Sequence, residues 1–323
     1  MLGLKRLGMT AIGFALALAA GAAFAQTKQL TIATGGTGGV YYPLGGGLAN
    51  IIGKVMPGYT ASAEVTGGSV ANLQAVGAKK TDIGFSQVDA AWDAINGLDK
   101  FKSGKLDIKA IGVLYPNHMH VVTVEGTGIS KIEDLKGKRV STGSPGSATE
   151  VFAFRVIEAA GLDPMKDVIR ERLGAAESVN AIKDKKIDAF FWVGGLPTAA
   201  VTDLAATPGT KIKFVDIAQN VDKMNAKYGK IYAPALIKKA TYGGMEQDTK
   251  NVTVWNILVV HGSMPDDLAY ALTKTLMETR ADLAKVHQEA LNIREDSQNA
   301  ANAGIPWHPA AVKYFKEKGI PVE

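Results

Sequence analysis

Short β-rich runs alternate with amphipathic stretches along almost the whole chain, and this alternation restricts the possible folds more than any other feature. Residues 30–34, 59–65 and 82–85 have the composition of strands, and a segment with helical periodicity follows each of them. Such an order is typical of βαβ units, in which helices cover a largely parallel sheet. We therefore predict an α/β fold.

The same order continues towards the end of the chain. Further strands are expected at residues 108–114, 119–124, 139–142, 168–172, 187–193, 212–215 and 252–260. Helices are expected at residues 44–55, from 69 onward, at 87–96, 148–160, 179–183 and 197–206, and again after Pro265.

A chain of 323 residues is long enough for two lobes, each with a core of its own. No Pro- or Ser-rich linker divides it, so we expect the chain to cross between the lobes more than once. We assign residues 26–116 and 228–323 to lobe I and residues 117–227 to lobe II. A ligand cleft is expected between the two lobes.

Residues 1–25 have the order of a secretory signal peptide. Lys5 and Arg6 precede an apolar stretch, and small residues form an A-x-A cleavage site at 23–25. The stretch is shorter than the roughly 20 apolar residues of a membrane span, and an uncleaved N-terminal anchor is the alternative. We predict export to the periplasm, cleavage before Gln26 and a soluble mature protein.

The composition excludes several classes of function. The chain has no Cys, which rules out a disulfide framework, a thiolate metal site and a cysteine nucleophile. Its formal net charge is only +5, and the basic residues are too scattered to indicate a nucleic-acid partner.

Three Gly- or Ser-rich turns, at residues 35–42, 66–69 and 141–147, each follow an expected strand and precede an expected helix. In open α/β sheets ligands bind beyond the carboxyl ends of the strands, where these turns lie. Free N–H groups at a helix start favour an anion. We predict that the ligand is a small anion bound by Gly36, Thr37, Gly38, Tyr41, Ser69, Ser86, Gln87, Thr142, Ser144, Gly146, Ser147 and Trp192.

Each of these features also has a purely structural interpretation. Ser147 with Glu150, and Ser86 with Asp89, have the spacing of capping boxes, which need no ligand. Trp192 ends a strand in which Phe190 and Phe191 are expected in the core, and it can face either the core or the cleft.

The sequence lacks recognisable motifs for nucleotide binding, catalysis or metal binding. Tyr41 stands where a dinucleotide fingerprint needs glycine, and the chain has neither a Walker lysine after a glycine run nor a G-x-S-x-G elbow. His118 and His120 share a strand face without an accompanying carboxylate motif. We therefore predict no cofactor, no metal and no enzymatic activity, although an enzyme that transforms a carboxylate in the same cleft is an alternative.

The sequence resembles the TAXI family (TRAP-associated extracytoplasmic immunogenic proteins), the substrate receptors of one class of tripartite ATP-independent periplasmic (TRAP) transporters. The resemblance covers essentially all of the expected mature chain. Six segments carry it in order, at residues 31–43, 66–73, 83–89, 135–143, 188–191 and 306–315.

The resemblance implies a type II periplasmic-binding-protein fold and delivery of the ligand to a fused TRAP membrane subunit. It also implies a small carboxylate ligand such as glutamate, glutamine or 2-oxoglutarate. The arginine that clamps the carboxylate in the sister receptor family has no evident counterpart, which favours backbone and hydroxyl donors. A sensor that presents its ligand to a signalling protein is the alternative. A monomer is favoured, and the polar run at residues 292–302 is assigned no role.

Overall fold

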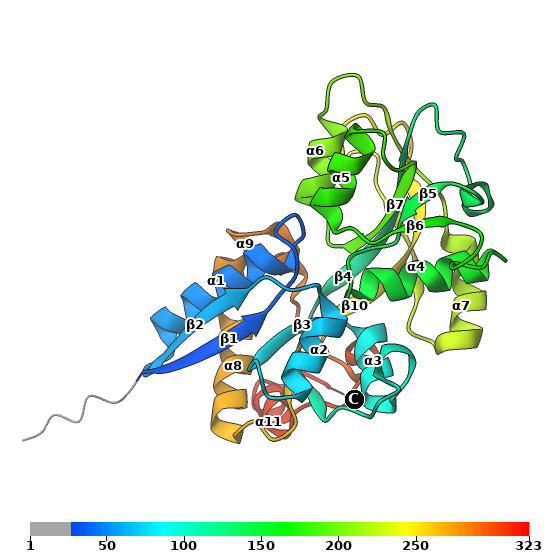
Figure 1. The fold of residues 1–323 in the computed structure, drawn as a ribbon. Coiled ribbons are helices and arrows are strands. Elements are labelled where there is room, and N and C mark those ends of the chain that lie inside the picture. The colour runs from blue at the N-terminus through cyan, green and yellow to red at the C-terminus, as the bar shows by residue number, and fades with distance from the viewer. Residues whose placement is uncertain (1–26, 323) are drawn as a thin grey trace, which may run out of the picture.

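Two long antiparallel strands, β4 (Ile108–Val124) and β10 (Thr249–His261), run through both halves of the molecule and join them (Figure 1). The computed structural model describes residues 27–322, and the signal peptide predicted at residues 1–25 lies outside this range. The sheet has the order β2-β1-β3-β10-β4-β7-β5-β6, with β8 beside β4 and β9 beside β10. The α/β prediction is confirmed.

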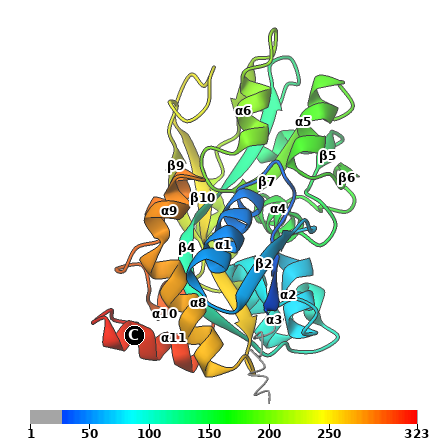
Figure 2. The ribbon, with the colours of Figure 1, turned by 90° about the vertical axis from the view of Figure 1, so that its left-hand side faces the viewer.

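Lobe I contains the first three strands, β1 (Lys28–Ala33), β2 (Tyr59–Glu64) and β3 (Ile83–Gln87), which are parallel to one another. Helices α1 (Tyr41–Val55), α8 (Asp266–Glu278) and α9 (Arg280–Ala284) lie side by side on one face of these strands (Figure 2). On the other face lie α2 (Ser69–Gly77) and α3 (Val88–Asn96). Short helices η1 (Asp99–Phe101), η4 (Gln288–Asn292), α10 (Ala300–Ala303) and α11 (Pro309–Glu317) complete the lobe.

Lobe II is built on strands β5 (Arg139–Ser141), β6 (Ile169–Glu171), β7 (Ala189–Gly194), β8 (Ile212–Phe214) and β9 (Ala233–Ile237). Its helices are η2 (Ile132–Leu135), α4 (Ala148–Ala159), α5 (Ala175–Lys183), α6 (Ala199–Ala205), η3 (Ala218–Asn220) and α7 (Val221–Tyr228). Phe190 and Phe191 are both buried, because β7 is covered on both faces.

The two strands expected at residues 108–114 and 119–124 form the single strand β4, and β9 was not expected as a strand. The proposed boundary at residue 116 falls within β4. β9 pairs with the first half of β10, and β10 pairs with β3 only from Asn256 onward. We therefore propose that residues 228–253, predicted above to belong to lobe I, belong to lobe II, and that the second crossing lies near residue 254.

The polar run at residues 292–302 docks on β4. The side-chain amide of Gln298 accepts a hydrogen bond from Val113 N–H at 2.8 Å and donates one to the Val113 carbonyl at 2.8 Å. Gln298 is fully buried, and this backbone-like pairing satisfies its amide. The run thus fastens the last part of the chain to a strand that crosses both lobes.

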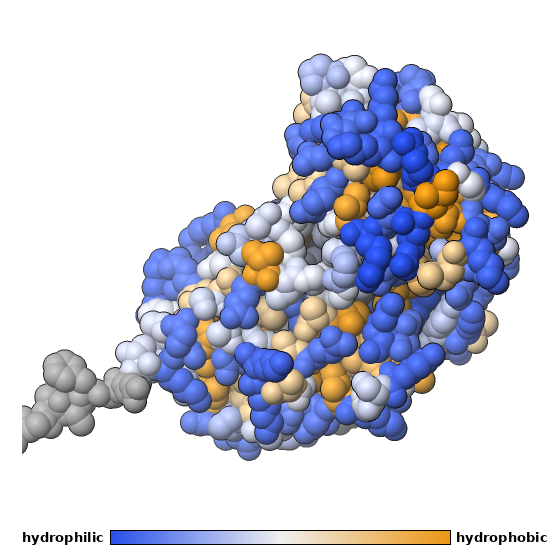
Figure 3. Space-filling view, in the orientation of Figure 1, coloured by the Kyte–Doolittle hydropathy of each residue, from blue (hydrophilic) through white to orange (hydrophobic). Residues whose placement is uncertain are grey.

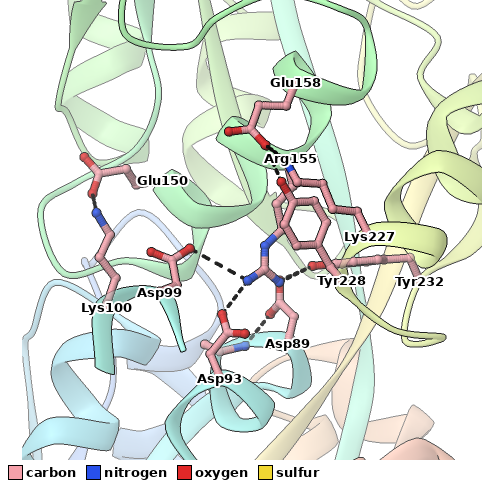
Figure 4. Close-up of polar contacts among 11 residues, drawn as sticks. Asp89, Asp93, Asp99, Lys100, Glu150, Arg155, Glu158, Lys227, Tyr228 and Tyr232 are labelled. Atoms are coloured by element: carbon pink, nitrogen blue, oxygen red, sulfur yellow. Dashed lines mark hydrogen bonds and ion pairs between the residues drawn. The ribbon is translucent and has the colours of Figure 1, made fainter. Parts of the chain in front are cut away.

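A buried ion cluster connects the lobes on one side of the sheet (Figure 4). Arg155 on α4 of lobe II binds Asp93 on α3 of lobe I, and Asp89 lies 3.9 Å from the same guanidinium group. Tyr232 accepts a hydrogen bond from Arg155 at 2.7 Å and donates one to Asp89 at 3.0 Å. Burial raises the pKa of Asp93 to about 6 and also raises the pKa of Asp89, and in both groups Arg155 counteracts the rise.

Replacing Arg155 by Met should destabilise the protein by about 3–5 kcal/mol, because two buried carboxylates lose their counter-charge. The pKa values of Asp89 and Asp93 in the folded protein should then rise further above their pKa values in the unfolded chain. Since such a folded state binds protons more tightly than the unfolded state, the stability deficit should be larger at about pH 8 than at about pH 5. Urea unfolding of Arg155→Met at both pH values measures the difference.

Arg294→Met provides the control, because Arg294 and Asp296 form an ion pair in which both side chains are 63% exposed. Its loss should cost less than about 1 kcal/mol at either pH. If Arg155→Met lowers the free energy of unfolding by the same amount at the two pH values, the loss of stability does not come from buried carboxylates that lack a counter-charge.

Candidate functional site

A cavity of about 320 Å³ lies between the lobes, where the surface is notched in the space-filling view (Figure 3). Three parts of the chain enclose it. Lobe I contributes the glycine loop before α1 and the turn before α2, and lobe II contributes the turns before α4 and α5. The middle of strand β4 and the end of strand β7 complete the enclosure. Its lining residues of lobe I include Gly36, Thr37, Gly38, Thr66, Gly67 and Ser69, and those of lobe II include Ser144, Ser147, Thr149, Arg172, Glu177 and Trp192.

Four helices from both lobes begin at this cavity. The lining residues at their first turns or N-caps are Val40 and Tyr41 of α1, Gly68 and Ser69 of α2, Ser147 and Ala148 of α4, and Gly174 and Ala175 of α5. Gln87, the N-cap of α3, lines it as well. Each helix start presents unpaired N–H groups and the positive end of a helix dipole. Together they make the cavity favourable for a negative charge.

The start of α4 offers free backbone N–H donors to the cavity. Ser147 caps the helix, because its hydroxyl oxygen accepts from Glu150 N–H at 3.1 Å. The N–H groups of Ala148 and Thr149 have no acceptor in the described part of the chain, and both residues line the cavity. The expected capping box is only half formed, since the Glu150 carboxylate instead accepts from Arg172 Nε at 2.8 Å.

The floor of the cavity is polar but uncharged. Tyr115 and Asn117 come from the middle of β4, and Gln87 comes from the end of β3. Tyr41 donates to Asn256 Oδ1 on β10. Burial raises the pKa of the Tyr41 and Tyr115 hydroxyls, so both stay protonated at neutral pH. The floor residues therefore come from β3 and from β4, one of the two strands that join the lobes.

Among the lining residues, only Arg172 and Glu177 carry a formal charge, and both are exposed at the rim. Arg172 shares Glu150 with Lys100 at 3.3 Å and Arg170 at 3.5 Å. Three cations thus surround one carboxylate, which leaves excess positive charge beside the start of α4.

Nine of the twelve predicted site residues line the cavity, namely Gly36, Thr37, Gly38, Tyr41, Ser69, Gln87, Ser144, Ser147 and Trp192. The other three do not. Ser86 is buried and donates to the Gln87 carbonyl, which also removes the capping box expected with Asp89. Thr142 is buried and donates to the Glu171 carbonyl. Gly146 faces α2, with Ala71 N–H donating to its carbonyl at 3.0 Å.

Tyr115, Asn117 and Arg172 also line the cavity but were not predicted from the sequence. Arg172 follows β6 directly. Because ligands bind beyond the carboxyl ends of strands in open α/β sheets, this position could have been predicted from the sequence. Tyr115 and Asn117 lie inside β4, and no local pattern marks a residue in the middle of a strand as a ligand contact. Their role depends on the pairing of β4 with β10, which joins residues 139 apart in sequence.

A model of the NMT1-like family matches residues 32–319. The chain belongs to the NMT1-like family.

Solved structures share the fold of this NMT1-like protein. A putative L-cystine ABC transporter from Listeria monocytogenes has a TM-score of 0.51 at 20% identity, and the match covers 82% of this chain and 96% of that one. A protein from Bordetella bronchiseptica RB50 has a TM-score of 0.53 at 19% identity, covering 90% and 82%. A structure described as a periplasmic transporter has a TM-score of 0.51 at 14% identity, covering 90% and 92%. The predicted two-lobed binding-protein fold is therefore confirmed.

None of the helices among residues 27–322 is both long and apolar enough to cross a membrane. In the same range no group of three His, Asp or Glu side chains is placed to hold a metal ion. His120 is buried between His118 and Tyr242, and burial lowers its pKa to about 3, so it acts as a neutral packing residue.

The two lobes of the NMT1-like chain touch across the cavity. Ser144 donates to the Gly67 carbonyl at 3.0 Å, and Ala200 N–H donates to the Gly38 carbonyl at 3.3 Å. Glycine makes this approach possible, because a Cβ on Gly67 would lie 2.2 Å from the Pro145 carbonyl oxygen.

Gly67→Ala should therefore hold the lobes apart while each lobe stays folded. We expect ligand affinity to fall by roughly 5- to 150-fold, which corresponds to an overpacking cost of about 1–3 kcal/mol. Small-angle scattering with and without ligand should show less compaction than in the wild type. Gly46→Ala is the control, since a Cβ there meets nothing within 4 Å. Wild-type affinity and compaction in Gly67→Ala would contradict this account.

Proposed function

We propose that this protein is the substrate receptor of a membrane import system and that it captures a small anion in the cavity between its lobes. The observation that carries the proposal is the convergence of the α1, α2, α4 and α5 N-termini on one enclosed space. The first turns of α1 and α2 contain no acidic residue that would neutralise their dipoles. Two of the proteins with a similar fold, a putative L-cystine ABC transporter and a periplasmic transporter, support the same role.

Capture would proceed by closure of the lobes. A ligand that contacts both lobes favours the closed arrangement only by its difference in affinity for the closed and open states. The donors from α1 and α2 lie in lobe I, and those from α4 and α5 lie in lobe II. An anion between them would complete hydrogen bonds that neither lobe offers alone.

The finer features of the proposal come from the sequence. The signal segment at residues 1–25 and the resemblance to TAXI receptors support a periplasmic receptor that delivers a carboxylate to a fused TRAP membrane subunit. The role would be capture and release without chemistry, in keeping with a floor whose tyrosines remain protonated.

A thermal-shift screen of the purified protein against small mono- and dicarboxylates, amino acids, sulfonates and inorganic anions tests the proposal. A true ligand should stabilise the folded state by about 2.7 kcal/mol when its concentration is 100 times its dissociation constant. Stabilisation by neutral or cationic solutes alone would overturn the assignment of an anion receptor.

Arg172→Gln should weaken binding of the best anion by about threefold to tenfold, the range of a partly exposed ionic contact. The affinity should also depend less on salt, because one cation at the rim has gone. Lys100→Gln is the matched control, since Lys100 pairs with the same Glu150 but does not line the cavity. Titration calorimetry at low and high salt measures both. Equal losses in the two variants would mean that Arg172 acts only through Glu150.

A further inference from the structure

Three buried polar atoms on the cavity floor have no hydrogen-bond partner within the described residues. They are Gln87 Oε1, Asn117 Oδ1 and the Tyr115 hydroxyl oxygen. Their side chains are 3% exposed or less, and all three residues line the cavity. Buried polar groups are nearly always paired in folded proteins, so three unpaired atoms at one end of one cavity indicate a group that a ligand supplies.

The hydrogen-bond network fixes the direction of the Asn117 amide. Asn256 Nδ2 donates to the Tyr115 carbonyl at 3.1 Å, which leaves Asn256 Oδ1 as an acceptor. That oxygen accepts from Asn117 Nδ2 at 2.7 Å and from the Tyr41 hydroxyl. A flipped Asn117 would place two oxygens against each other, so its Oδ1 must be the atom left over. A carbonyl oxygen can only accept, and the missing partner must therefore be a donor.

The other two atoms agree with this requirement. Gln87 also leaves an amide oxygen unpaired, and the Tyr115 phenol can donate or accept. A carboxylate placed here would set its lone pairs against those of Asn117 Oδ1. An ammonium group would be buried without a carboxylate in contact, because neither carboxylate near the floor lines the cavity. Asp89 is held by Arg155 and Tyr232, and Glu289 accepts from Leu196 N–H and Asn292.

We propose that the ligand carries, at the end opposite its acid group, a neutral group with an N–H or O–H donor that binds Asn117, Gln87 and Tyr115. This inference rests on the proposed function, because the acid group is taken to lie at the helix N-termini. The ligand is thus a monoanion with an amide or hydroxyl tail, and a diacid is disfavoured.

Matched five-carbon acids test the tail chemistry on the wild-type protein. Glutaramate and 5-hydroxypentanoate offer a donor, monomethyl glutarate offers only acceptors, glutarate offers a second carboxylate and 5-aminopentanoate offers an ammonium. We expect the amide or hydroxyl acid to bind at least about tenfold more tightly than the other three. The four- and six-carbon homologues repeat the comparison, so that chain length does not decide it.

The outcomes separate this inference from the proposed function. If the ester, the diacid or the ammonium acid binds most tightly at every chain length, the neutral-donor tail is wrong while the anion receptor stands. If none of these acids binds and only non-anionic solutes stabilise the protein, both proposals fail together.

Tyr115→Phe tests the floor directly. Because its hydroxyl has no protein partner, the ligand-free variant should keep its melting temperature or gain slightly. Affinity for the preferred amide or hydroxyl acid should fall about tenfold, and affinity for the methyl ester should not change. Tyr242→Phe should behave in the opposite way, since that hydroxyl bonds Thr198 and His120 outside the cavity. A Tyr115→Phe variant that loses stability but keeps all its affinity ratios would overturn the proposal.

Discussion

A single buried guanidinium group sets the relation between the two lobes. Arg155 lies on α4, whose first turn lines the cavity from lobe II, and its partners Asp89 and Asp93 lie on α3, whose N-cap Gln87 lines it from lobe I. The ion cluster thus connects a helix that begins at the floor of the cavity with one that begins at its lobe II wall. Because isolated buried charges are costly, neither half of the cluster is stable without the other. The lobes are therefore joined behind the cavity by groups that do not line it.

The sequence was sufficient to locate the walls of the site but, apart from Gln87, not its floor. Ligands of open α/β sheets bind beyond the carboxyl ends of the strands, so the turns at residues 66–69 and 141–147, each after a strand of a different lobe, could be assigned to the cleft from the order of strands and helices along the chain. Gly146 shows the limit of that argument, because which side of a turn faces the cavity depends on the neighbouring helix α2. Asn117 could not be found locally, since its meaning comes from Asn256, a partner on another strand.

Charge is distributed unevenly through the cavity, and this distribution bears on selectivity. Arg172 and Glu177 stand at the exposed rim, helix N-termini form the walls, and the floor consists of amides and phenols. Formal charges at the rim act in a high-dielectric environment and contribute more to attraction than to discrimination. Discrimination requires buried groups that are left unpaired by the wrong ligand, and in the described chain those groups are on the floor.

Away from the Arg155 cluster, the lobes are joined by single hydrogen bonds, and the strongest of them links Leu196 N–H of lobe II to the buried Glu289 carboxylate of lobe I. Each backbone or hydroxyl bond, such as Ser144 to Gly67, replaces a bond to water and contributes only about 1 kcal/mol net. The Arg155 cluster and the apolar core shared by α2, α3 and α4 join the lobes on the other side. We therefore expect a ligand to favour the closed arrangement, because it would accept hydrogen bonds from the free donors of both lobes. Permanent contacts at the Arg155 cluster, together with contacts across the cavity that a ligand completes, would allow the proposed receptor both to bind and to release its ligand.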